Sequence, residues 1–215
     1  MKMKESKITG IVARSIDYKD NDKLLTVVTA AGTASIIIKG VRSEKAKLKL
    51  ACSLFSLVEY SCMECAGGLY QATTASVVSR YFSVWTDIRR YSAASILTEA
   101  ISKVASESTD TIEELELLKN LLAIVDESDV NPLVVTAYGL NLLFSLEGVD
   151  YEDFAIPIPE RELLTALNNS GPAQLDSLDA TEPLLLALLG TMGRIYHYAF
   201  SAKLNSVYET IKIFA

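Results

Sequence analysis

Residues 23–41 read Lys-Leu-Leu-Thr-Val-Val-Thr-Ala-Ala-Gly-Thr-Ala-Ser-Ile-Ile-Ile-Lys-Gly-Val, and this stretch decides the fold class. Two runs rich in β-branched residues, 23–30 and 34–41, flank a break at Gly32-Thr33. β-Branched residues favour strands, and a glycine between two such runs is typical of a turn. The stretch therefore predicts two consecutive strands.

Three further strand patterns surround this pair. They cover residues 7–16, 53–61 and 69–78, with turn signals at Asp17–Asp22 and Gly67-Gly68. Five strands in about 70 residues, punctuated by turns, favour a small closed barrel of the OB or SH3-like type.

The hydrophobic period changes to a helical one after Tyr81. Apolar residues then recur every three to five positions from Trp85 to Val104, and Thr111-Ile-Glu-Glu114 has the pattern of a capping box. Helices are expected to begin near 85, 111, 131, 160 and 182, the last running to 203, before a final segment at 205–214. The sequence thus predicts an α+β protein, with an N-terminal five-stranded OB-type β-barrel over residues 1–79 and an all-α helical domain over residues 80–215.

Charge is distributed unevenly along the 215 residues. The net charge is -7, yet residues 1–50 carry 11 Lys and Arg against 5 Asp and Glu, and the remainder carries 9 against 22. The segment 39–49 alone holds five basic residues and one acidic residue, directly after a predicted strand. Such a loop favours an anionic partner, with a phosphate backbone as the leading candidate, although charge runs are often only solvated surface.

Signatures of enzymes, membranes and metals are weak. The chain lacks a Walker A loop, GxGxxG, GxSxG and HExxH, and its one histidine is His197. It has neither an apolar run of the ~18 residues that span a membrane nor an evident signal peptide, so a cytoplasmic, non-enzymatic protein is expected. Cys62 and Cys65 form a lone CxxC with only Cys52 besides, whereas a structural zinc site needs four ligands. We expect no metal and no cofactor.

Basic and aromatic residues of the predicted barrel suggest a nucleic-acid surface. OB-type barrels bind single strands through a basic groove and aromatic platforms. Tyr18, Tyr60 and Tyr70 are candidates for stacking on bases.

The same region resembles a known family. Ile8-Thr-Gly-Ile-Val-Ala-Arg-Ser-Ile-Asp-Tyr-Lys-Asp-Asn-Asp-Lys-Leu-Leu-Thr26 is similar to the opening of RecO, the bacterial recombination mediator. Lys39–Leu48, Leu54–Tyr60 and Gly68-Leu-Tyr70 continue the resemblance in the same order, and Ala202–Tyr208 resembles the family's C-terminal segment. Many members carry a four-cysteine zinc module in the helical domain, but this chain has no cysteine after residue 65.

The resemblance implies a non-enzymatic role in recombinational DNA repair. Such proteins bind single- and double-stranded DNA, anneal strands, and work with RecR to load recombinase onto DNA coated by single-strand binding protein. It places DNA contacts on Arg14, Lys23, Lys39, Arg42, Lys45, Lys47 and Lys49, which the charge pattern also selects. It also implies that the helical domain binds the C-terminal tail of single-strand binding protein, for which we choose Arg194 and Lys203, nine residues apart on one expected helix face.

Two alternatives remain open. The chain could be a protein-interaction module whose basic loop docks an acidic partner. It could also use Cys62 and Cys65 in thiol redox chemistry.

Overall fold

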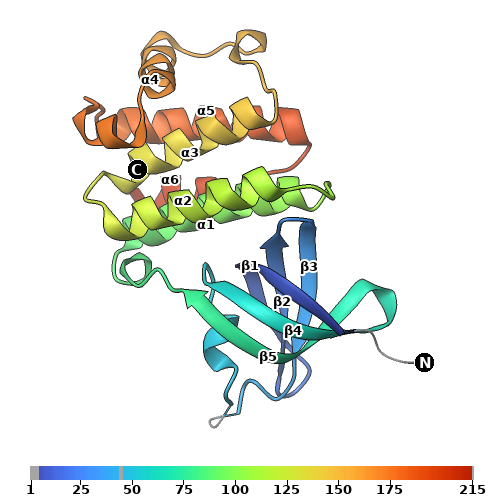
Figure 1. The fold of residues 1–215 in the computed structure, drawn as a ribbon. Coiled ribbons are helices and arrows are strands. Elements are labelled where there is room, and N and C mark those ends of the chain that lie inside the picture. Colours follow the sequence, from blue (N-terminus) through green and yellow to red (C-terminus); the bar gives the residue numbers. More distant parts are fainter. Residues whose placement is uncertain (1–4, 44–45, 215) are drawn as a thin grey trace. The chain divides into compact units, whose positions relative to one another are not determined.

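The computed structural model describes residues 5–43 and 46–214 (Figure 1). Packing groups the chain into two compact units. The first holds the residues up to Tyr81 together with Ile101–Lys119, and the second holds Phe82–Ala100 together with the chain from Asn120 onward. The predicted domain boundary between residues 79 and 80 stays a prediction.

The first unit contains a closed five-stranded barrel. Its strands are β1 (Glu5–Tyr18), β2 (Asp22–Thr29), β3 (Gly32–Ile38), β4 (Leu57–Glu64) and β5 (Leu69–Ser79), with 3-10 turns at Lys49–Cys52 and Ala66–Gly68. They follow the order β1-β2-β3-β5-β4, and β4 pairs with β1 to close the barrel. All neighbours are antiparallel except β3 and β5, which are parallel. This Greek-key arrangement confirms the predicted OB-type barrel.

Alternate residues of the two strands that the sequence marks most clearly lie in the barrel core, together with residues of the other three strands. Leu25 and Val27 of β2 and Ile36 and Ile38 of β3 are fully buried. Each such side chain contributes roughly 1.5–3 kcal/mol relative to exposure. Because side chains alternate along a strand, the residues between them face outward and remain available for binding.

The β2–β3 hairpin is held by the segment that precedes the second long helix. The Thr111 hydroxyl donates to the Thr29 carbonyl over 2.7 Å and accepts from the Gly32 N–H over 2.8 Å. Gly32 has φ +89°, and a Cβ there would lie 2.5 Å from the Ser108 carbonyl oxygen. The sequence predicted Thr111 as a local helix cap, but its hydroxyl instead bonds the hairpin.

The remaining elements are helical, as expected. They are α1 (Ile88–Ala105), α2 (Ile112–Glu127), α3 (Pro132–Leu146), α4 (Ile158–Asn168), α5 (Glu182–Phe200) and α6 (Asn205–Phe214), with 3-10 turns at Ser83–Trp85, Tyr151–Asp153 and Pro172–Ser177. Among the helices that the structure describes, none is long and apolar enough to cross a membrane.

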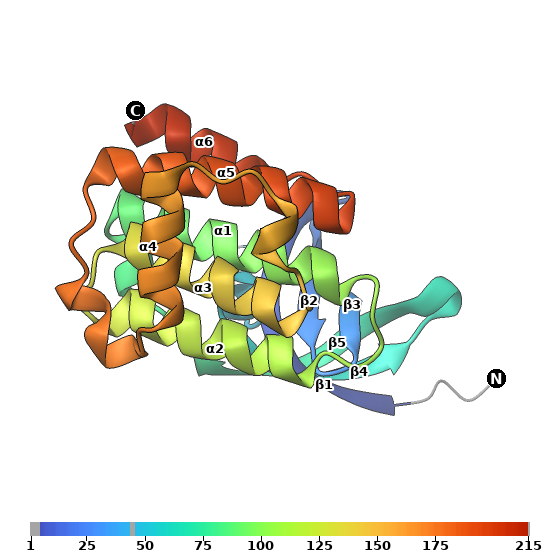
Figure 2. The ribbon, with the colours of Figure 1, turned by 90° about the horizontal axis from the view of Figure 1, so that it is seen from above.

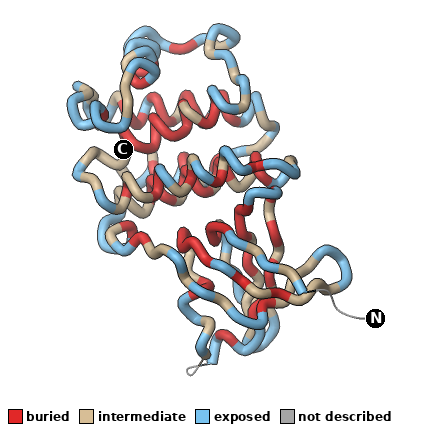
Figure 3. The backbone as a smooth tube through the Cα atoms, in the orientation of Figure 1, coloured by how far each residue is buried: buried red, intermediate tan, exposed pale blue. Residues whose placement is uncertain are grey.

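Helix α3 is the most buried helix of the second unit (Figure 3). It begins as the sequence predicted, with Pro132 at its first turn and the Asn131 side chain accepting from the Leu133 N–H. A Cβ at Gly139 would approach Leu97 and Leu121 to 2.5 and 2.7 Å, so a glycine here lets neighbouring helices pack closely.

Candidate nucleic-acid interface

The basic loop (residues 39–49) leaves β3 beside the β1–β2 turn. Gly40 has φ +64° and its N–H donates to the Asp22 carboxylate over 2.9 Å. The Arg42 N–H donates to the Asn21 carbonyl over 3.0 Å. These bonds fix the start of the loop against the turn, which explains why both lie at the same end of the barrel.

Two of the predicted contact residues share one acidic partner. Asp17 pairs with Lys23 over 3.1 Å and with Arg42 over 3.2 Å. Arg42 also donates from Nη1 to the Asp20 carbonyl over 3.1 Å. Lys23 and Arg42 thus join the turn to the loop, and their charges are partly balanced. Exposed pairs of this kind are weak, so a phosphate can compete for them.

The other described candidates are free to meet an anion. Arg14, Lys39, Lys47 and Lys49 are exposed, and none of them forms an ion pair within residues 5–43 and 46–214. Lys45 lies outside the described residues. Arg14, Lys39, Lys47 and Lys49 are thus unpaired cations on or beside the barrel.

Arg14 lies in a polar row across three strands. It faces Thr26 of β2, which faces Ser35 of β3. The next outward row is apolar and consists of Ile16, Leu24 and Ile37. Lys39 follows Ile37 by two residues, so the alternation of side chains along the strand places it on the same outward side.

This face corresponds to the β2–β3 surface with which OB-type barrels bind oligonucleotides. Sequence reasoning selected Arg14 but missed the hydroxyls of Thr26 and Ser35 and the apolar row. In residues 23–38 buried side chains alternate with less buried ones, and the buried ones are the more apolar. This alternation identifies Thr26, Ser35 and the residues of the apolar row as outward-facing.

The predicted aromatic platform is only partly present. Tyr60 is wrong as a stacking residue, because it is 1% exposed and its hydroxyl donates to the Ala51 carbonyl over 2.5 Å. Tyr70 is half-buried and packs against the barrel core. Tyr18 is half-buried at the end of β1, with the Lys19 ammonium 5.2 Å from its ring centroid. Apolar contacts to bases would therefore depend mainly on the row of Ile16, Leu24 and Ile37.

The cysteines lie in a setting that disfavours thiolates. Burial raises the pKa of Cys52 to about 11, against a lowering influence of Lys23. Burial, with a smaller contribution from Cys65, raises the pKa of Cys62 to about 11. The reactive form of a thiol is the thiolate, so the redox alternative gains no support here. Within the described residues no group of three or more His, Cys, Asp or Glu is placed to hold a metal ion.

In the second unit, Arg194 borders an apolar pocket of about 240 Å³. The pocket is lined by Phe154, Ala155, Thr191, Arg194, Ile195 and Tyr198. The rings of Phe154 and Tyr198 meet edge to face at 5.4 Å. Arg194 donates from Nη2 to the Thr191 hydroxyl over 2.7 Å, and that hydroxyl donates to the buried Glu160 carboxylate. The guanidinium is thereby held at the rim.

Lys203 does not share a helix face with Arg194. Helix α5 ends at Phe200, and Ser201 follows in the left-handed region with φ +52°. Because the chain leaves the helix there, the spacing of nine residues no longer places the two cations on one face. The expectation of one shared face was therefore wrong, although each residue remains a candidate.

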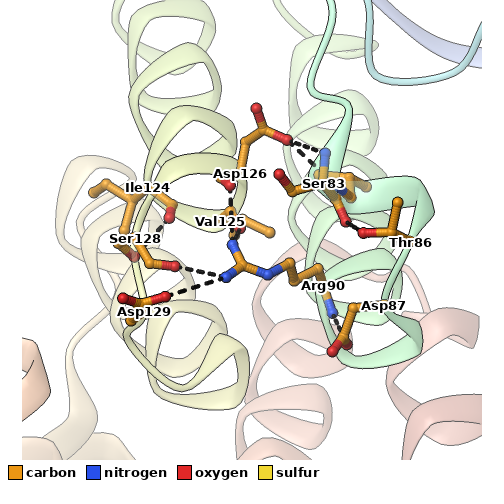
Figure 4. Close-up of polar contacts among 10 residues, drawn as sticks. Ser83, Thr86, Asp87, Arg90, Ile124, Val125, Asp126, Ser128 and Asp129 are labelled. Atoms are coloured by element: carbon orange, nitrogen blue, oxygen red, sulfur yellow. Dashed lines mark hydrogen bonds and ion pairs between the residues drawn. The ribbon is translucent and has the colours of Figure 1, made fainter.

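Two other basic residues of this unit have structural partners. Arg90 donates to the carbonyls of Val125, Asp126 and Ser128 at the end of α2 (Figure 4). Arg89 pairs with Glu182 over 3.0 Å. Cations at a helix C-terminus satisfy carbonyls that lack intrahelical partners. These arginines are thus less available to a ligand than Arg194.

Comparison with known proteins agrees with this geometry. A family model described as "Recombination protein O N terminal" matches residues 3–81, which contain the barrel. A protein from Thermoanaerobacter sp. (strain X514), named DNA repair protein RecO, is 26% identical over 170 residues, which make up 78% of this chain and 68% of the relative. A protein of the same name from Anaeromyxobacter dehalogenans (strain 2CP-1) is 27% identical over 143 residues, covering 66% and 56%. The chain thus spans between about half and two thirds of the length of these relatives, and its N-terminal barrel is similar to that of the RecO family.

Proposed function

We propose that this chain is a non-enzymatic DNA-binding mediator of recombinational repair in the cytoplasm. The similarity of its barrel to the N-terminal part of RecO proteins supports a role in DNA repair and recombination. In this proposal it binds single- and double-stranded DNA, anneals strands, and acts with RecR to load recombinase onto DNA coated by single-strand binding protein.

The observation that carries the proposal is a set of unpaired cations on an OB-type barrel. Arg14 and Lys39 lie on or beside the outward face of β1, β2 and β3, and Lys47 and Lys49 are exposed on the following loop. Cations neutralise phosphates and release counterions, and the hydroxyls of Thr26 and Ser35 can donate to phosphate oxygens. The apolar row next to them gives bases a surface to pack on.

A salt titration of single-strand DNA binding tests the proposal. The variant Lys39→Ala/Lys47→Ala/Lys49→Ala should weaken binding and flatten the plot of log affinity against log salt by up to ~2, since each contact on a single strand contributes about 0.7. The effect should be nearly independent of base sequence, because phosphates carry no sequence information.

A matched control removes the same charge elsewhere. Lys119→Ala/Arg161→Ala/Lys212→Ala changes three exposed or half-exposed cations of the helices. It should leave the salt slope unchanged. Equal loss in both variants would show that net charge, rather than this surface, governs binding, and would contradict the proposed site.

The alternative function is a protein-interaction module whose basic loop docks an acidic partner. The exposed, unpaired lysines of the loop suit that partner as well. Binding of naked DNA with the salt slope given above excludes it, whereas a protein that does not bind DNA supports it.

For the helical unit we propose that the pocket beside Arg194 receives the C-terminal tail of single-strand binding protein. An apolar pocket with one held guanidinium suits a short apolar tail that ends in a carboxylate. Calorimetry with the tail peptide should detect micromolar binding, and Arg194→Ala should weaken it about tenfold or more. Lys203→Ala measures the second predicted residue separately. No heat at millimolar peptide would contradict this assignment.

A further inference from the structure

The first half of β1, residues 5–9, is paired along only one edge within the part of the chain that the structure describes. β4 pairs with β1 from Glu5 to Ile11. β2 pairs with β1 only from Gly10 onward, where Gly10 faces Thr29. In Figure 2 this half of β1 reaches past the ends of β2 and β3. It therefore presents one open strand edge.

The backbone groups of Lys7 and Thr9 point to this open edge. Val12 donates its N–H to the Ser56 carbonyl over 3.0 Å and accepts from the Phe55 N–H over 2.8 Å, on the side of β4. In an antiparallel strand the N–H and C=O of one residue share an edge, and successive residues alternate. The β1–β4 register is unbroken between residues 5 and 11. Every second residue back from Val12 thus faces β4, and Thr9 and Lys7 face away from it.

A groove of about 450 Å³ follows the same edge. It is lined by Ser6, Lys7, Ile8 and Thr9 of β1, by Thr29, Ala30, Ala31, Thr33 and Ala34 of the hairpin, and by Tyr70. Of these lining residues only Lys7 is charged. The other side chains are small, hydroxyl-bearing or apolar, so the groove can accept an extended backbone without steric conflict from long side chains.

The two faces of this part of β1 differ in chemistry. Ile8 points inward and packs against the barrel core, as does Tyr70. Lys7 and Thr9 are exposed on the opposite face, where Lys7 faces Ser61 of β4. A strand added beside β1 would direct alternate side chains to the apolar face and to the face of Lys7, which also carries Glu5 of β1 and Glu59 of β4. Opposite charges across neighbouring strands are favourable.

We propose that this edge of β1 is a docking site for an extended segment of a partner protein, which adds a strand beside Lys7 and Thr9 and alternates apolar with acidic residues. Strand addition takes its affinity from main-chain hydrogen bonds and its selectivity from alternate side chains. The single charge in the groove selects an acidic partner strand. The inference stands independently of DNA binding, because it concerns a different edge and different atoms.

Amide hydrogen exchange measured by NMR reports on the proposal directly. In the free protein the amides of Lys7 and Thr9 should exchange fast, whereas those of Ser6 and Ile8, bonded to β4, should exchange slowly. The probe is an eight-residue peptide of alternating valine and glutamate. On adding it, exchange at Lys7 and Thr9 should slow at least tenfold, and exchange at Ser6 and Ile8 should change little.

Two variants of Lys7 distinguish the contribution of its backbone N–H to peptide binding from that of its side chain. Lys7→Pro removes the outward N–H but keeps the bonds to β4, since proline is tolerated at an edge where its missing N–H faces solvent. It should weaken peptide binding about tenfold. Lys7→Ala keeps the N–H and should weaken binding only about two- to fivefold, in a salt-dependent way. Thr9→Pro repeats the backbone test if Lys7→Pro lowers stability.

Several results would overturn the proposal. Slow exchange at Lys7 and Thr9 in the free protein would mean that the edge is already occupied. Slowing that depends on protein concentration, without peptide, would assign the edge to a second copy of this chain. A peptide with lysine in place of glutamate that binds equally well, or no slowing at millimolar valine–glutamate peptide, would also contradict it. Slowing caused by single-strand DNA would assign the edge to nucleic acid instead.

Discussion

Thr111 shows how one side chain can join distant parts of the chain. It is fully buried, and its hydroxyl bonds both Thr29 and Gly32 of the β2–β3 hairpin. Thr111→Val keeps the shape but leaves a buried carbonyl and a buried N–H without this partner. We expect a loss of about 1–3 kcal/mol in the free energy of unfolding, measured by urea denaturation.

The matched control is Thr111→Ser, which keeps the hydroxyl and loses one methyl group. It should cost clearly less than the valine variant. If both substitutions cost the same, packing of the methyl group and not the hydrogen bonds would explain the importance of this position.

The buried thiols predict a pH dependence of stability. The pKa of Cys52 and that of Cys62 are each raised from an ordinary 9.0 to about 11. Between these values the unfolded thiol loses its proton while the folded one keeps it, so the unfolded state is favoured as pH rises. The stabilisation is present below pH 9 and should be lost as pH approaches 11. Denaturant titrations across this window measure the fall.

A Cys52→Ala/Cys62→Ala variant provides the comparison. Burial raises the pKa of Tyr60, and Cys52 and Cys62 add to that rise, so the variant also lessens the shift of this tyrosine. The variant's free energy of unfolding should therefore fall less steeply between pH 9 and 11. Identical slopes would show that these thiols do not titrate differently in the two states.

At the scale of the elements, the C-terminal end of α2 is hydrogen-bonded by a side chain of another helix. Arg90 of α1 donates to three carbonyls at the C-terminus of α2 (Figure 4). The Asp126 carboxylate accepts from the Ser83 N–H over 2.6 Å and so joins the preceding turn to the same corner. Arg90→Ala should lower the free energy of unfolding by about 1–3 kcal/mol, because these carbonyls lose charge-assisted bonds.

Arg161→Ala is a suitable control for the loss of an arginine. Arg161 is exposed and donates one long bond, 3.4 Å, to the Phe154 carbonyl. Its replacement should change stability by about 0.5 kcal/mol or less. A loss for Arg90→Ala no larger than this would show that solvent satisfies the end of α2 equally well.

Elements with a strong hydrophobic period were predictable, and their ends were less so. The strands around Leu25 and Ile36 follow from their runs of β-branched residues and the glycine break between them. The predicted strand at 53–61 begins instead at Leu57, because Phe55 has φ +66°. Similarly, α5 stops before Ser201 without a glycine or proline to mark its end. Such local backbone conformations depend on tertiary contacts that periodicity does not report.

The basic character of the candidate site could be predicted from the sequence, but the ion pairs within it could not. The density of Lys and Arg in residues 39–49 identified the loop. It could not show that Asp17 pairs with both Lys23 and Arg42, because that contact depends on how the β1–β2 turn meets the loop. Likewise, the sequence alone could not show that Tyr60 is buried, because this depends on which side chains of β4 point into the barrel.

At the scale of the whole molecule, the unequal charge distribution should govern how fast DNA is captured. Residues 1–50 are net basic, whereas the remaining 165 residues carry 22 acidic and 9 basic side chains. A negative field from the remainder repels DNA at distances up to the Debye length, which is ~30 Å at 0.01 M salt and ~8 Å at 0.15 M. Association should therefore be slower than the basic surface alone would allow.

Neutralising exposed acids far from the barrel in sequence tests this expectation. The variant Glu152→Gln/Asp153→Asn/Glu162→Gln/Asp176→Asn removes four negative charges from exposed positions. By stopped flow, its association rate with single-strand DNA should rise about two- to tenfold at 0.01 M salt, and the gain should shrink at 0.15 M because of screening. The control exchanges Glu and Asp at the same four positions, which keeps every charge and should leave the rate unchanged. Equal rates for the neutralised variant and the control at low salt would mean that the acidic remainder exerts no field at the DNA surface, so that contacts local to the barrel alone set the rate of capture.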